Sequence, residues 1–132
     1  MSTPASVVTG VDFVTVFVKD FAAAVEFYGA MLGLRCSARY GRADGAEFEI
    51  GNLTLQVMDA EAIGREFHPS THPIALHVDD VEAVRAGLES RGVPFKGETI
   101  DSGVCHMAFF EDPDGNALML HRRYAPRASA SS

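Results

Sequence analysis

Five side chains in this sequence are the candidates for moving protons or binding a metal ion at one site. They are Glu47, Glu49, His77, His106 and His121. A histidine with its ordinary pKa of about 6.5 transfers protons at neutral pH, and imidazole and carboxylate groups are common ligands of zinc and iron. His77 is the best candidate acid or base, polarised by Glu47 or Glu49 and assisted by His121. We expect no metal, and a displaced metal site built from these side chains stays open as an alternative.

The elements that must position these residues repeat along the chain. Val18-Lys19-Asp20 has a counterpart 60 positions later in Val78-Asp79-Asp80, and each motif follows an alternating apolar run and precedes a helical pattern. Asp20 and Asp80 suit helix N-caps, because a carboxylate accepts hydrogen bonds from the free amides of the first turn. Gly33 and Gly92 are plausible ends for the two helices.

Three further strands fit into each half of the chain. They are predicted near residues 35–42, 45–51, 53–59, 95–100, 104–111 and 117–124. Asp112-Pro113-Asp114-Gly115-Asn116 has the composition of a tight turn. We therefore expect an α+β protein with the order βαβββ twice. It forms a single domain over residues 10–124, with repeat one at 11–60, repeat two at 72–124, a linker at 61–71 and a disordered tail at 125–132.

Strand alternation predicts which side chains face away from the helices and line a concave sheet. Matching Gly51-Asn52-Leu53-Thr54-Leu55 with Gly115-Asn116-Ala117-Leu118-Met119, 64 positions later, extends this prediction to the last strand of each half. The predicted ligand-binding residues are Phe13, Thr15, Phe17, Glu47, Glu49, Leu55, Val57, His77, His106, Met119 and His121. The strand parity of His106 stays open. An apolar face with a few polar groups is typical of a small-molecule site, although these residues could instead form a second core closed by dimerisation.

Composition excludes several other classes of function. The net charge of −7 disfavours nucleic acid, which attracts clustered Lys and Arg. Apolar runs are too short for a membrane helix, and the first ten residues do not resemble a signal peptide. Two cysteines, Cys36 and Cys105, lack metal-ligand spacing, so we expect free thiols and a cytoplasmic location.

Residues 13–34, with Val18/Asp20, Phe27/Tyr28 and Leu32/Gly33/Leu34 as landmarks, resemble the opening strand and helix of the vicinal oxygen chelate superfamily. This superfamily includes glyoxalases, bleomycin-resistance proteins and extradiol dioxygenases. Residues 110–116 are similar to its characteristic turn, and the resemblance covers residues 10–124. It implies two βαβββ repeats that form a cupped mixed sheet with helices packed on the outside.

The resemblance also implies four cup positions where metal-dependent members place His, Gln or Glu. In this sequence they fall on Phe13, Leu55, Pro73 and Met119, none of which is a competent ligand for a divalent ion. A shift of one residue would bring in Asp12, Gln56 and His72 instead. Without a metal, the chemistry shared by the superfamily loses its Lewis acid.

The sequence therefore favours a metal-free small-molecule-binding protein without a cofactor. It would be closest to the bleomycin-resistance branch and would sequester an aromatic or cationic compound, as in antibiotic resistance. The alternative is a glyoxalase-like lyase or isomerase, or a dioxygenase, acting on a small carbonyl or vicinal-oxygen substrate, with His77 as its catalytic residue. A regulatory or scaffold module is a third possibility. A homodimer is expected, because pairing would protect the open cups and the sheet edges.

Overall fold

The structure is a computed structural model that describes residues 6–42 and 44–126. Its elements follow the predicted order of strand, helix and three strands, twice. The first half contains β1 (Phe13–Val18), α1 (Phe21–Val25), η1 (Glu26–Met31), β2 (Arg35–Arg39), β3 (Gly45–Ile50), β4 (Leu53–Asp59) and η2 (Glu61–Ile63). The second half contains β5 (Ile74–His77), α2 (Val81–Ser90), β6 (Phe95–Asp101), β7 (Cys105–Glu111) and β8 (Ala117–Arg123).

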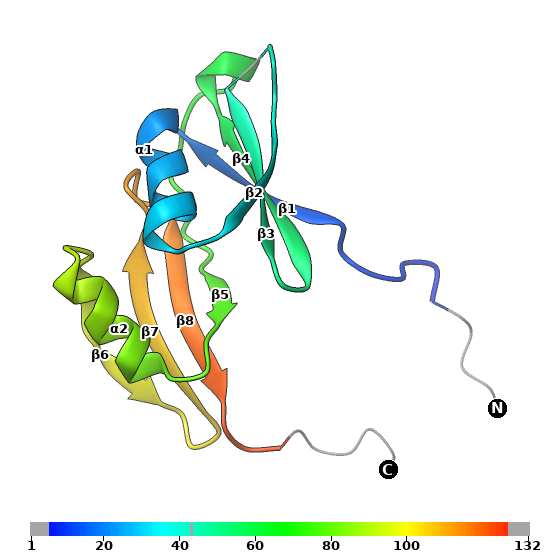
Figure 1. The fold of residues 1–132 in the computed structure, drawn as a ribbon. Coiled ribbons are helices and arrows are strands. Elements are labelled where there is room, and N and C mark those ends of the chain that lie inside the picture. Colours follow the sequence, from blue (N-terminus) through cyan, green and yellow to red (C-terminus); the bar gives the residue numbers. More distant parts are fainter. Residues whose placement is uncertain (1–5, 43, 127–132) are drawn as a thin grey trace.

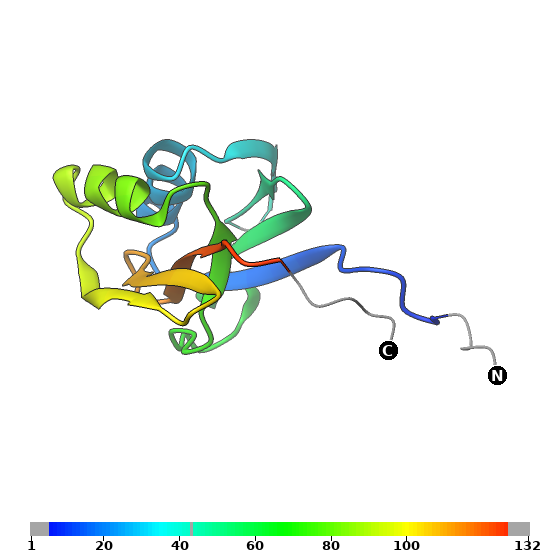
Figure 2. The same ribbon diagram turned by 90° about the horizontal axis from the view of Figure 1, so that it is seen from below.

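Each half forms its own four-stranded mixed sheet, as shown in Figure 1. The strand orders are β1-β4-β3-β2 and β5-β8-β7-β6. The first and last strands of each half pair in parallel, and the other neighbours are antiparallel. In both views α1 (blue) and α2 (yellow-green) lie at the same side of the molecule (Figures 1 and 2). The predicted α+β fold with outer helices is therefore confirmed.

The helices begin where the sequence predicts. Asp20 accepts a hydrogen bond from the Ala23 amide at 3.1 Å, and Asp80 accepts one from the Ala83 amide at 3.0 Å. The first helix differs from a regular α-helix because it widens into the π-helix η1 after Val25. Phe27 and Tyr28 are both buried in this segment, at 7% and 0% exposure.

The Asp112–Asn116 loop of the second half forms hydrogen bonds with the first half. The Tyr28 hydroxyl donates to Asp112 Oδ2 at 2.7 Å, and Asn116 Nδ2 donates to the carbonyl of Phe17 at 2.9 Å. Asp114 accepts from the backbone amides of Lys19 and Asp20 at 2.8 and 3.0 Å. Because Asp112 and Asn116 are buried, these contacts fix the second half against the end of β1 and the start of α1.

Between β4 and β5 runs the segment predicted as a linker. The 61–71 linker contains the short helix η2, which ends at Gly64 with a φ of 78°. Of the tail predicted to be disordered, residues 127–132 lie outside the described residues. Across the described ranges, no helix is both long and apolar enough to cross a membrane.

Candidate functional site

The structure corrects the predicted position of Leu55 and Val57. Both side chains are buried, at 1% and 0% exposure, and the two residues pair with Val14 and Val16 of the neighbouring strand β1. They therefore belong to the core under the helices. The cup face of β4 carries the alternate residues, including Gln56.

The error came from unequal turns in the two repeats. In the first half Ile50 pairs with Leu53 across a two-residue turn, whereas in the second half Glu111 pairs with Ala117 across a five-residue loop. In the folded repeats Gln56, rather than Leu55, is the counterpart of Met119, so the strands are offset by 63 positions and not by 64. A shift of one residue moves a strand's side chains to the opposite face.

The residues at the cup positions do not fit the metal that the resemblance implies. With the corrected register these positions are Phe13, Gln56, Pro73 and Met119, and only Gln56 has an oxygen donor. A single neutral amide oxygen is not a site for a divalent ion, which needs several donors. Among the residues that the structure describes, no group of three or more His, Cys, Asp or Glu side chains is placed to hold one.

A chain of hydrogen bonds crosses the cup face of the first sheet. Thr15 Oγ1 donates to Gln56 Oε1 at 2.7 Å, Gln56 Nε2 donates to the Tyr40 hydroxyl at 2.9 Å, and that hydroxyl donates to Glu47 Oε2 at 2.5 Å. Partial burial and the bond to Glu47 raise the pKa of Tyr40, so it stays a donor. Sequence reasoning missed Tyr40, which follows the end of β2 and reaches the sheet only through the fold.

Glu49, the second carboxylate predicted on this face, is also held by hydrogen bonds. Ser37 Oγ donates to Glu49 Oε2 at 2.5 Å, and Thr54 Oγ1 donates to Glu49 Oε1 at 2.9 Å. These hydroxyls, Ser37 first, lower the pKa of Glu49, so its negative charge persists below the usual range for a glutamate. Both carboxylates are thus ordered on one face of the sheet.

Apolar side chains accompany this polar chain. Phe13, Phe17 and Met58 share the cup face, because Phe13 pairs with Thr54 and Phe17 pairs with Met58. Phe13 is 54% exposed. The guanidinium carbon of Arg65, from the linker, lies 4.8 Å from the centre of the Phe17 ring. This face therefore combines an aromatic ring that already accepts a cation with two fixed carboxylates.

The second sheet brings His77 and His121 together. These residues are partners across β5 and β8, and Met119 lies on the same face two residues earlier. His77 Nε2 lies 3.5 Å from Asp79 Oδ1 on an exposed surface. The predicted polarisation of His77 by Glu47 or Glu49 is not seen within the chain, because those carboxylates bond to residues of their own sheet.

His106 lies on the other face of the second sheet. Its neighbour Met107 pairs with His121, so alternation directs His106 away from the cup. His106 Nε2 lies 3.4 Å from Asp101 Oδ2, and its ring packs 4.9 Å from the Tyr124 ring. The prediction that His106 lines the cup is therefore wrong.

Known proteins share this fold and part of this sequence. YraH of Bacillus subtilis (strain 168), an uncharacterised protein, is 29% identical over 122 residues, which cover 83% of this chain and 94% of YraH. The crystal structure of TnmS3, an antibiotic binding protein from Streptomyces sp. CB03234, is 24% identical with a TM-score of 0.76, covering 90% of this chain and 99% of TnmS3. That of lactoylglutathione lyase from Agrobacterium tumefaciens is 18% identical with a TM-score of 0.73, covering 86% and 92%.

The family comparison agrees with the two βαβββ halves and the loop that joins them. The sequence model of the Glyoxalase/Bleomycin resistance protein/Dioxygenase superfamily matches residues 10–120, which include every strand except the end of β8. The chain belongs to the Glyoxalase/Bleomycin resistance protein/Dioxygenase superfamily.

Proposed function

We propose that this protein binds and sequesters a small aromatic or cationic molecule on its cup face, as a bleomycin-resistance-like protein. One observation carries the proposal: Glu47 and Glu49 are held by hydrogen bonds on the same sheet face as Phe13 and Phe17. Fixed carboxylates attract a cation without having to be reordered, and aromatic rings bind both flat molecules and cations.

Two further points support a cationic aromatic guest. The Arg65 guanidinium stacked on Phe17 is a positively charged planar group on this ring, and a cationic aromatic guest would take its place. TnmS3, which has a similar fold, is described as an antibiotic binding protein. Such a ligand needs no metal, and the cup positions offer a single oxygen donor, that of Gln56.

The proposal includes a homodimer. The cup faces of the two halves belong to separate sheets, and each sheet leaves one edge of β1 or β5 without a strand partner in its own sheet. Within the chain, the halves contact one another through the Asp112–Asn116 loop and through Arg91, whose guanidinium donates to the Ala30 and Met31 carbonyls. A second copy would cover the exposed edges and close the cup.

The test is calorimetric titration with cationic aromatic compounds, for example bleomycin, ethidium and berberine. We expect saturable binding by at least one of them and an increase in Tm with ligand concentration. Glu47→Gln and Glu49→Gln should each weaken binding about tenfold, because each removes a charge-assisted contact. Glu98→Gln, an exposed carboxylate change on β6, is the matched control and should leave affinity unchanged.

If none of these compounds binds, or if Glu47→Gln and Glu98→Gln behave alike, cationic sequestration on this face is ruled out. An uncharged aromatic analogue separates the contribution of the carboxylates from that of the aromatic rings. It should keep its affinity in Glu47→Gln, since only the aromatic contact is used.

A lyase or isomerase acting on a small carbonyl compound is the second candidate. The observation in its favour is the pair of neighbouring histidines, with His77 beside Asp79. The activity would be supported if the parent protein exchanges the α-proton of a carbonyl ligand with solvent, and a His77→Ala variant binds the same ligand without this exchange. Unchanged exchange would exclude His77 as the base.

We also propose a cytoplasmic location. Cys36 and Cys105 are both free thiols, and Cys36 is exposed. An exposed thiol is compatible with a reducing compartment.

A further inference from the structure

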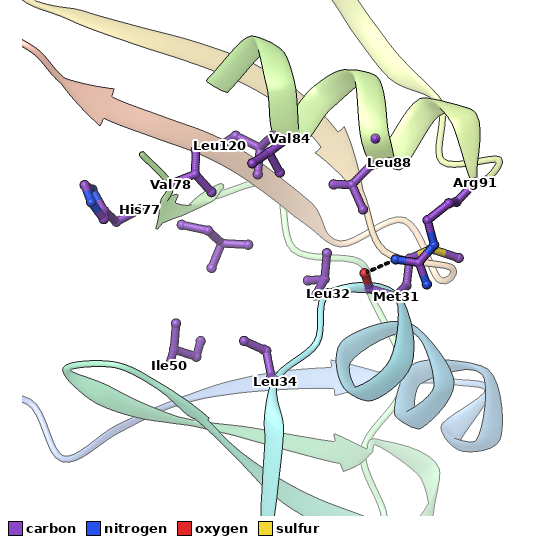
Figure 3. Close-up of a pocket in the computed structure, with 12 residues that line it drawn as sticks. Met31, Leu32, Leu34, Ile50, His77, Val78, Val84, Leu88, Arg91 and Leu120 are labelled. Carbon is purple, nitrogen blue, oxygen red and sulfur yellow. Dashed lines mark hydrogen bonds between the residues drawn. The ribbon is translucent and has the colours of Figure 1, made fainter. Parts of the chain in front are cut away.

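A second, apolar groove lies between the two halves, and apart from His77 the strand residues that line it belong to the face opposite to the cup. The volume of the groove is about 360 Å³. The first half contributes Met31, Leu32, Leu34 and Ile50, and the second half contributes Leu76, His77, Val78, Val84, Gly87, Leu88, Arg91 and Leu120 (Figure 3). We call this site the interhelical groove.

One face of α2 forms the wall of the interhelical groove. Val84, Gly87, Leu88 and Arg91 follow helical spacing, so their side chains lie on one side of the helix. Gly87 is a gap in this wall, because a Cβ atom built at this position would meet no other atom within 4 Å. A glycine inside an exposed helix costs about 1 kcal/mol relative to alanine, so no gain in helix stability explains it.

Charge at the groove is already balanced. Arg91 is the charged side chain of its lining, and it donates to the carbonyls of Met31 at 3.1 Å and Ala30 at 3.2 Å. These carbonyls end η1, and Arg91 itself caps the C-terminal end of α2. Both helix ends carry partial negative charge, which the guanidinium offsets.

A charged ligand would have to give up its hydration in a mostly apolar lining, whose one guanidinium already donates to two backbone carbonyls. We propose that the interhelical groove binds an uncharged, mostly apolar molecule of the size of two or three fused or linked rings. Its volume lies at the lower end of the range for small-molecule sites, about 300–1,000 Å³. A single acceptor atom on the ligand could use a remaining N–H group of Arg91, which has five and donates two here.

Two fluorescent probes with the same aromatic skeleton test the charge preference. N-phenyl-1-naphthylamine is uncharged, and 1-anilinonaphthalene-8-sulfonate carries one added sulfonate. We expect saturable binding of the uncharged probe at one molecule per chain and binding of the sulfonate at least about tenfold weaker. Equal or tighter binding of the sulfonate, or no saturable binding of the uncharged probe, would overturn the proposal.

Gly87→Leu locates the probe. A leucine there fills the groove from α2 without strain, because position 87 is helical and the space is open. We expect it to weaken binding of the uncharged probe at least about tenfold by steric exclusion. Gly87→Ala, which makes the same gain in helix propensity with only a methyl group, should weaken binding much less.

Ala86→Leu, on the neighbouring side of α2, controls for added apolar surface, and Phe17→Ala, which removes an aromatic ring from the cup face, controls for binding in the cup. Both should bind the uncharged probe like the parent protein. If Gly87→Leu binds normally, or if the cup variant loses binding, the probe occupies another site and the groove is not the one proposed. These outcomes are independent of the antibiotic titrations, so the two proposals fail separately.

Discussion

At the scale of single residues, the hydroxyl of Tyr28 is a buried polar group that bonds the first half to the second. Tyr28 is fully buried, and its hydroxyl donates to Asp112, which is 5% exposed. Burial and the neighbouring carboxylate raise the pKa of Tyr28, so it remains a neutral donor. Phe27 and Tyr28, which form one of the landmarks of the family resemblance, therefore have a structural role. They pack the first half against the second.

Tyr28→Phe should lower the free energy of unfolding by about 1–2 kcal/mol, because it removes a buried hydrogen bond to a charged group. Complete loss of folding is not expected, since Asp112 still accepts from Asn116 Nδ2 at 2.8 Å. Urea denaturation measures the change. Tyr124→Phe removes an exposed hydroxyl bond to Asp101 of the same length, 2.7 Å, and should change stability by less than about 0.5 kcal/mol. Equal losses would show that the burial of Tyr28 is not important.

At the scale of elements, the two helices show how local sequence signals survive in the folded protein. The N-caps at Asp20 and Asp80 are as predicted, because each depends only on the three residues that follow. The shift to a π-helix at Glu26 had no such local signal. It accompanies burial of two adjacent aromatic residues, and their partners, Phe48 and Phe110, lie far away in sequence.

Asp80→Ala should destabilise the protein by about 1 kcal/mol, because the Ala83 amide loses its acceptor at the start of α2. Asp79→Ala is the matched control one residue earlier. Its side chain is 94% exposed and forms only long contacts with His77 and Arg122, so we expect a change of a few tenths of a kcal/mol. Guanidinium denaturation followed by circular dichroism distinguishes them, and a larger loss in Asp79→Ala would refute the assignment of the cap.

At the scale of the whole molecule, the most exposed large apolar side chains among the described residues lie in the N-terminal segment and at the start of β1. Phe13 is 54% exposed, and Val7, Val8 and Val11 are 98%, 77% and 63% exposed. The N-terminal segment extends away from the two halves in both views (Figures 1 and 2). This distribution agrees with the proposed homodimer, because exposed apolar patches often mark interfaces.

Light scattering during gel filtration should give about twice the chain mass of 14.2 kDa. Phe13→Asp should shift the protein towards the single-chain mass, because a charge would then lie in the middle of the proposed interface. Ile63→Asp, which places the same charge on the exposed helix η2, should remain dimeric. A single-chain mass for the parent protein, or an unchanged mass for Phe13→Asp, would contradict this arrangement.

The sequence by itself determined the two βαβββ repeats, the helix caps and the faces of the strands that begin each half. These features depend on short-range spacing, such as the two-residue alternation through Phe13, Thr15 and Phe17. Glu47 and Glu49 were placed correctly on the open face for the same reason.

Only the tertiary structure decided which face of β4 enters the cup, where His106 points, and how the two carboxylates are held. The turn before β4 is three residues shorter than its counterpart in the second half. The cup position predicted at Leu55 is therefore occupied by Gln56. The bond between Tyr40 and Glu47 joins the end of one strand to the middle of the next. Pairing between strands is a long-range property, so a register taken from matching the two repeats can be wrong by one residue, which moves every side chain of the strand to the opposite face.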